Sequence, residues 1–105
     1  MVGSIYLAKV FFTDGAKYKL RPILIIKENS FGDFIYIPFT TKRNNKNSLE
    51  FDNDSLISGS FQKKSYLIVD KTCTIQQMLL EKKIGTVNDT MMEKVLNEYC
   101  FFLRN

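Results

Sequence analysis

Residues 21–27 read Arg-Pro-Ile-Leu-Ile-Ile-Lys, a nearly continuous apolar run. A strand with this pattern is typically covered on both of its faces, because its apolar residues do not alternate with polar ones. Pro22 has no backbone N–H, so we expect it at the start of the strand or on an edge. The run therefore predicts a buried strand at the centre of a β-rich core.

Strand-like segments flank this run on both sides. Residues 4–12 and 34–41 are rich in β-branched and aromatic side chains, which favour extended structure. An Asp-Gly pair within residues 13–16 predicts a turn. We further predict loops over residues 28–33 and 42–47, strands over residues 48–51, 65–74 and 83–87, irregular chain over residues 53–64 and a short helix over residues 75–80.

The last part of the chain is predicted to be an amphipathic helix. Asn88 and Asp89 are favourable N-cap residues, and Asp89 also interacts well with the positive end of the helix dipole. Apolar residues then recur at helical spacing, as in a helix that packs one side on a core or on a second subunit. These residues are Met91, Met92, Val95, Leu96, Tyr99, Phe102 and Leu103.

Short strands followed by one terminal helix indicate a mainly β (α+β) fold. Such a sheet is expected to be small, strongly bent and capped by the helix. The 105 residues are typical of one domain, residues 1–105. A core of this size is marginal, so an oligomer would add stability.

Charge and residue types restrict the possible chemistry. The chain has 15 Lys and Arg against 11 Asp and Glu, and its charge of +4 fits a nucleic-acid or acidic-peptide partner as well as an ordinary solvated surface. It has no His, the commonest metal ligand and general base. Cys73 and Cys100 form no CxxC motif, so we predict two buried, reduced thiols, no metal and no cofactor. No apolar run approaches the roughly 20 residues of a membrane span and no signal peptide is evident, so we expect a cytoplasmic protein without membrane contact.

Polar residues stand out at the ends or within the apolar segments. Arg21 opens the most apolar strand, Thr40 and Thr41 close another, and Asp70 interrupts residues 65–74. One interpretation is a buried ion pair between Arg21 and Asp70 that fixes strand register. The other is a phosphodiester site, in which arginine clamps the phosphate, a threonine donates a hydrogen bond to it and the carboxylate accepts the proton of a ribose 2′-hydroxyl.

Several sequence blocks along nearly the whole chain are informative when they are taken together. The first three are residues 3–7 (GSIYL), 19–26 (KLRPILII) and 37–41 (IPFTT), and residues 67–75, 83–85 and 89–95 follow in order. This succession resembles the MazF/PemK family of toxin ribonucleases from bacterial toxin–antitoxin pairs.

The resemblance implies both a fold and an activity. It implies a small SH3-like, strongly bent antiparallel barrel with a C-terminal helix, the fold also used by the gyrase-poisoning toxin CcdB. It implies a homodimer that cuts single-stranded mRNA at short sequences without a metal, leaves 2′,3′-cyclic phosphate and 5′-hydroxyl ends, and so inhibits translation and growth. A cognate antitoxin with an acidic C-terminal segment would inhibit it. The family's catalytic residues fall on Arg21, on Thr40 with Thr41 beside it, and, for the acidic residue of the PemK/Kid branch, on Asp70.

Two arginines of the family pattern are missing here. Ile68 stands two residues before Asp70, and Cys73 precedes the Thr-Ile dipeptide. Lysines can supply positive charge in their place. The predicted RNA-binding residues are Lys17, Lys19, Lys42, Arg43 and Lys71, and Tyr18, Phe31 and Phe61 are candidates to stack on unpaired bases.

Three alternative functions stay open at this point. The same barrel could poison gyrase as CcdB does, it could be a non-catalytic or decayed member of the family, or it could be a basic barrel that binds acidic peptides. The block over residues 19–26 favours the ribonuclease branch.

Overall fold

A computed structural model of the chain describes residues 2–11, 15, 17–43 and 46–105. The elements in this part are β1 (Ser4–Phe11), β2 (Tyr18–Glu28), β3 (Phe34–Thr40), β4 (Ser48–Phe51), the 3-10 helix η1 (Asn53–Ser55), β5 (Leu56–Gly59), β6 (Ser65–Ile68), β7 (Cys73–Ile75), the 3-10 helix η2 (Gln77–Leu79), β8 (Leu80–Val87) and α1 (Asp89–Arg104). The turn predicted over residues 13–16 lies, except for Gly15, outside the described residues.

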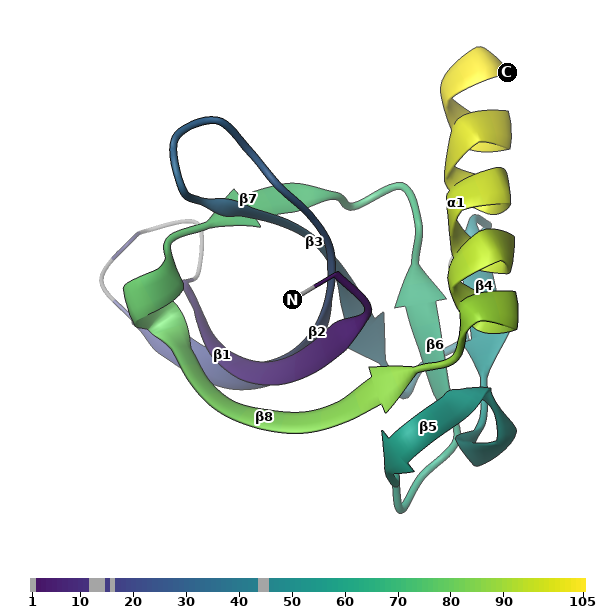
Figure 1. Cartoon of the computed structure of the whole chain (residues 1–105), viewed down its shortest axis with the longest axis horizontal. Helices are drawn as coiled ribbons and strands as arrows, with labels where there is room; N and C mark the ends of the chain where they lie inside the picture. Colours follow the sequence, from purple (N-terminus) through teal and green to yellow (C-terminus); the bar gives the residue numbers. More distant parts are fainter. Residues whose placement is uncertain (1, 12–14, 16, 44–45) are drawn as a thin grey trace.

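The strands form one strongly bent antiparallel sheet. Its order is β4-β6-β3-β2-β1-β8-β5, and β7 pairs with β3 off this path. The first half of β3 pairs with β7 and its last two residues pair with β6, so the sheet turns a corner along β3. In Figure 1, β1, β2, β3, β7 and β8 curve around one centre, while β4, β5, β6 and α1 lie to one side. This confirms the prediction of a mainly β, barrel-like fold with a C-terminal helix.

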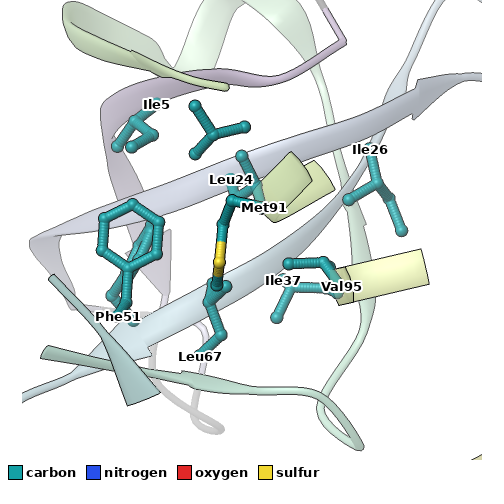
Figure 2. Packing of buried hydrophobic residues seen from close by; sticks show 10 residues of the cluster. Ile5, Leu24, Ile26, Ile37, Phe51, Leu67, Met91 and Val95 are labelled. Carbon is teal, nitrogen blue, oxygen red and sulfur yellow. The ribbon is translucent and has the colours of Figure 1, made fainter. Parts of the chain in front are cut away.

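Side chains of β2 enter two separate cores. Ile23 and Ile25 pack with Ala8 and Phe34 inside the curved part of the sheet. Leu24 and Ile26 point the other way, into a cluster that α1 closes and that Figure 2 shows. Both faces of the 21–27 run are therefore covered, as the apolar pattern predicted.

The two prolines lie at the point where β3 leaves β2. The last pair of the β2–β3 ladder joins Ile23 to Pro38, and the next two residues of β3 pair only with β6, on the other side of the strand. Pro22 lies inside β2, opposite Leu7 of β1, so it is not at the strand start; strand β2 has no β3 partner at this position, which agrees with the expected edge. A residue without a backbone donor is accommodated here because the ladder to β3 has already ended.

Helix α1 begins where the sequence predicted. The side chain of Asn88 caps it by accepting a hydrogen bond from the backbone N–H of Met91 at 2.8 Å. Met91 and Val95 are buried against the sheet. From Leu96 onward the helix carries exposed apolar side chains, and in Figure 1 its C-terminal end extends past the strands. These side chains are Leu96, Phe101, Phe102 and Leu103.

The single strand predicted over residues 65–74 is wrong. Strand β6 ends at Ile68, the chain turns at Val69 and Asp70, and β7 begins at Cys73. The backbone N–H of Val69 bonds to the carbonyl of Asn47, and that of Lys71 bonds back to the carbonyl of Ile68. The turn lets the two short strands pair with different halves of β3, which local pattern alone does not reveal.

Three further boundaries differ from the sequence prediction. Strand β5 lies within the stretch expected to be irregular, and Gly59 at its end pairs with Gly85 of β8. Strand β8 begins at Leu80, earlier than predicted, and the helix expected over residues 75–80 is reduced to η2.

The prediction of buried thiols was also wrong, because Cys73 and Cys100 are both exposed. No helix in the described part of the chain has the length and apolar character needed to cross a membrane.

Candidate nucleic-acid interface

Arg21 and Thr40 come from neighbouring strands. The β2–β3 ladder ends at the pair Ile23–Pro38. Arg21 is two residues before Ile23 and Thr40 is two residues after Pro38, so each projects from the same face as its member of that pair. Residues opposite each other in an antiparallel pair project from the same face of the sheet. The two side chains therefore share one face, at the end of the ladder where β3 turns toward β6.

This line of residues continues across two more strands. Thr40 pairs with Tyr66 of β6, and Tyr66 pairs with Glu50 of β4. We call the four residues Arg21, Thr40, Tyr66 and Glu50 the cross-strand row. Adjacent paired strands are about 4.8 Å apart, so the part of the row from Thr40 to Glu50 is about 10 Å long from backbone to backbone. An arginine, a threonine, a tyrosine and a glutamate are thus aligned on one face.

The hydroxyl of Thr40 is oriented by its own turn. Its oxygen accepts a hydrogen bond from the backbone N–H of Lys42 at 3.2 Å. A hydroxyl that accepts one bond in this way keeps its proton to donate to another group. Thr41 follows in an exposed bend directly after β3.

Arg21 is half-exposed and lies opposite the small side chain of Ala8. It forms no ion pair with any carboxylate of the described residues, Asp70 included. The interpretation of a buried Arg21–Asp70 pair is therefore wrong for the described structure. The guanidinium charge is left available for an anionic ligand.

Asp70 lies outside the cross-strand row. It is exposed in the turn after β6, four residues beyond Tyr66. The expectation that it lies inside an apolar strand was wrong. The side-chain amide of Asn47 donates a hydrogen bond to its Oδ2 at 3.1 Å. This bond leaves Oδ1 open to solvent or to a ligand.

Two cations flank the middle of the row. The guanidinium carbon of Arg43 lies 5.9 Å from the centre of the Tyr66 ring. Nζ of Lys64 lies 2.7 Å from Oε1 of Glu50, and this hydrogen-bonded pair lowers the pKa of Glu50 and raises that of Lys64. Sequence reasoning missed Tyr66, Glu50 and Lys64, since strand pairing brings Tyr66 beside Thr40 and Glu50 beside Tyr66, and an ion pair adds Lys64.

The other predicted RNA-binding lysines are exposed. Lys19 lies on β2 near Arg21, and Lys71 lies in the same turn as Asp70. Lys17 precedes β2, and Lys42 follows Thr41. All four are accessible to a polyanion, and neither of the ion pairs in the described structure involves them.

The aromatic residues proposed to stack on bases have three different surroundings. Phe61 packs against Phe39 and Phe51 with ring centres 5.1 and 5.6 Å away, so it belongs to the core. Phe31 is 86% exposed but lies in the loop that joins the far ends of β2 and β3, roughly 20 Å along the strands from Arg21. Tyr18 is half-exposed and contacts Phe11. Of the three, only Tyr18 is both exposed and close to Arg21 in sequence.

Two hollows of the described surface lie elsewhere. One, of about 600 Å³, follows the outward side of α1 from Asp89 to Glu98, and the other, of about 330 Å³, lies between Phe51 and Lys64. Neither is lined by Arg21 or Thr40. The row is instead formed on one face of a bent sheet, a surface that can follow an extended chain.

The described residues contain no cluster of three or more His, Cys, Asp or Glu that could hold a metal ion.

Comparison with known proteins gives a consistent result. Residues 1–103 match the family model described as a PemK-like, MazF-like toxin of type II toxin–antitoxin systems. No curated protein sequence matches significantly.

Solved structures with the same fold cover nearly the whole chain. The Mycobacterium tuberculosis toxin MazF-mt6 is 24% identical, with 91% of this chain and 90% of that chain covered and a TM-score of 0.65. A mycobacterial endoribonuclease in complex with its cognate antitoxin is 18% identical, with 98% and 91% covered and a TM-score of 0.71. The MazE–MazF structure from Deinococcus radiodurans is 12% identical, with 97% and 93% covered and a TM-score of 0.73.

Proposed function

Because the chain belongs to the PemK-like, MazF-like toxin family of type II toxin–antitoxin systems, we propose that it is an endoribonuclease that cuts single-stranded mRNA. The observation that carries the proposal is the placement of Arg21 and Thr40 on one face, with no ion pair that neutralises the arginine among the described residues. A structurally similar mycobacterial chain is described as an endoribonuclease, which supports the same reaction class.

The proposed reaction uses a nucleophile that is already part of the substrate. The 2′-hydroxyl before the cut attacks the adjacent phosphorus, and the bond to the 5′-oxygen of the next nucleotide breaks. The products are a 2′,3′-cyclic phosphate and a free 5′-hydroxyl. Attack within one molecule gains much of its rate from proximity, so the proposed mechanism is independent of metal ions.

Arg21 and Thr40 have complementary roles in this proposal. The guanidinium of Arg21 offers a fork of N–H donors to the non-bridging oxygens and stays charged at every relevant pH. Thr40, whose oxygen already accepts from Lys42, donates its hydroxyl proton to the same phosphate. Both contacts strengthen as negative charge builds up on the pentavalent phosphorane, which is how such donors accelerate a reaction. Thr41, next along the chain, is a further hydroxyl donor in this proposal.

Asp70 is the proposed acceptor of the 2′-hydroxyl proton. Its exposed Oδ1 is open to the substrate, and Asn47 holds its other oxygen. Because Asp70 lies outside the cross-strand row, its assignment is independent of those of Arg21 and Thr40 and needs its own test.

The partners in this proposal follow from charge and from unpaired apolar surface. Lys17, Lys19, Lys42, Arg43 and Lys71 provide positive charge along the RNA backbone. The exposed apolar end of α1 is the proposed contact of a homodimer, and the acidic C-terminal segment of a cognate antitoxin would compete with RNA for the basic face. In this proposal residues 1–105 act as one toxin domain in the cytoplasm and inhibit translation and growth.

The test is cleavage of a long RNA by the purified protein in the presence of a chelator. We expect fragments with 2′,3′-cyclic phosphate and 5′-hydroxyl ends. Arg21→Ala should reduce the rate by about a hundredfold or more and leave the fold intact, because loss of one transition-state donor has that effect. Lys27→Ala is the matched control, since Lys27 is an exposed cation at the far end of the same strand.

Two outcomes would contradict the proposal. One is full cleavage by Arg21→Ala. The other is an inert wild-type protein that instead traps gyrase on DNA in a parallel assay, which would favour the CcdB-like alternative.

A further inference from the structure

We propose that Arg43, positioned by Tyr66, binds the phosphate next to the one that is cut. The inference rests on the proposed function and adds a specific phosphate subsite to it. Arg43 follows Thr40 by three residues, and Tyr66 is the residue that pairs with Thr40 across the sheet. The guanidinium of Arg43 is therefore held over the ring of the residue that is paired directly with Thr40 on the neighbouring strand.

Tyr66 restricts where the guanidinium of Arg43 can lie. The tyrosine is only 9% exposed, so its ring is fixed by the core, while Arg43 itself is exposed. The guanidinium lies over the ring, 5.9 Å from its centre. A cation over an aromatic ring is attracted to the ring's negative face, and a guanidinium has five N–H donors with which to bind an anion. A long side chain that is already ordered loses less conformational entropy when it binds an anion.

The start of the loop is ordered as well. The hydrogen bond from the Lys42 N–H to Thr40 Oγ1 holds the chain from Thr40 to Lys42, the residue before Arg43. The same hydroxyl that faces the proposed scissile phosphate therefore also sets the path toward Arg43. The proposed phosphate contacts of Thr40 and Arg43 are therefore linked by a segment of only three residues.

Charge pairing distinguishes Arg43 from the neighbouring lysine. Lys64 is paired with Glu50 at 2.7 Å, so its charge is largely neutralised. Arg43 has no ion-pair partner among the described residues. Arg43 interacts electrostatically with Glu50 but forms no direct ion pair with it, so a polyanion beside Thr40 meets Arg43 without displacing a carboxylate, whereas binding to Lys64 would require displacement of Glu50.

The experiment measures RNA binding and cleavage separately. Binding uses a short single-stranded RNA that contains the cleavage sequence with a 2′-deoxy nucleotide before the cut, over a range of salt concentrations. Each phosphate contact in a single strand contributes about 0.7 to the slope of log affinity against log salt. Arg43→Gln should lower the slope by about 0.7 and raise KM several-fold, with kcat within about twofold of the wild-type value.

Tyr66 variants test whether the ring acts through Arg43. Tyr66→Phe keeps the ring and should behave as the wild type. Tyr66→Leu should lower the salt slope and raise KM as Arg43→Gln does. The double variant should show no larger change than Arg43→Gln alone. Because Tyr66 is buried, Tyr66→Leu is interpreted only if its thermal unfolding shows a folded protein, and the Arg43 variants decide the proposal without it.

A neutral substrate position provides the sharpest control. Two RNAs are compared, in which an uncharged methylphosphonate replaces the phosphate on one side of the cut or on the other. With one of these two RNAs, wild type and Arg43→Gln should bind with the same affinity and the same salt slope. Lys27→Ala should leave the salt slope unchanged, because this exposed cation lies at the far end of β2.

The subsite proposal is wrong if Arg43→Gln has the same salt slope as the wild type. It is also wrong if the two proteins still differ in affinity for both methylphosphonate RNAs. If RNA is cut in an Arg21-dependent way in that same experiment, the proposed function stands and only the subsite is wrong. If the wild type neither binds nor cuts RNA, both are wrong.

Discussion

The hydroxyl oxygen of Thr40 accepts a hydrogen bond from the backbone N–H of Lys42 at 3.2 Å, at the point where β3 ends. The bond gives this threonine two functions, because it orders the following loop and leaves the hydroxyl proton directed to another acceptor. Thr40→Ser keeps both, and we expect cleavage within about fivefold of the wild-type rate. Thr40→Val removes both, and kcat should decrease by about a hundredfold. Single-turnover cleavage of a short RNA measures both rates.

Thermal unfolding separates the two effects of Thr40→Val. The residue is half-buried and valine has the same shape, so the midpoint should change little. Wild-type cleavage by a folded Thr40→Val protein would remove Thr40 from the proposed site.

Asp70 offers a second test. General base catalysis by a positioned carboxylate accelerates proton transfer by about a hundredfold or more. Asp70→Asn keeps the size of the side chain, so kcat should decrease by that factor while KM stays close to the wild-type value. Asn47→Ala removes the hydrogen bond to Oδ2 without removing the carboxylate, and its effect on kcat should be much smaller. Equal effects of the two variants would mean that Asp70 only supports the turn.

The C-terminal turns of α1 expose apolar side chains that a second copy of the chain would cover. Leu103 is 62% exposed and Leu96 lies one heptad before it, on the same side of the helix. Leu103→Glu would place a charge in the proposed dimer contact, so the protein should sediment as a monomer. Asn97→Glu adds the same charge beside Glu93, on the polar side, and should leave the dimer intact. A wild type that sediments as a monomer at all concentrations would contradict this contact.

Gly59 should tolerate no side chain. Its φ is +84°, and a Cβ there would lie 2.1 Å from the carbonyl oxygen of Ile84. Gly59→Ala combines left-handed strain with a backbone clash, so we expect a loss of about 3 kcal/mol or more in the free energy of unfolding. Gly32 has a similar φ of +81° with open space around it, and Gly32→Ala should lose only about 1 kcal/mol. Urea unfolding of both variants isolates the effect of the close contact with β8.

Local features of the sequence determined several elements by themselves. The cap at Asn88 and the helical spacing after it predicted α1, because a helix start depends on hydrogen bonds within a few residues. The unbroken apolar run after Arg21 predicted a strand covered on both faces. The order of sequence blocks indicated the toxin family, which the match over residues 1–103 confirms.

Only the tertiary structure decided how the candidate site is arranged. Strand pairing aligns Thr40, Tyr66 and Glu50, which lie far apart in sequence, and Arg21 shares their face just beyond the last pair of the β2–β3 ladder. The same long-range pairing divides residues 65–74 into two strands and places Asp70 in an exposed turn. The physical reason is that a strand satisfies its backbone hydrogen bonds with partners remote in the chain, so its register depends on segments that local pattern does not contain.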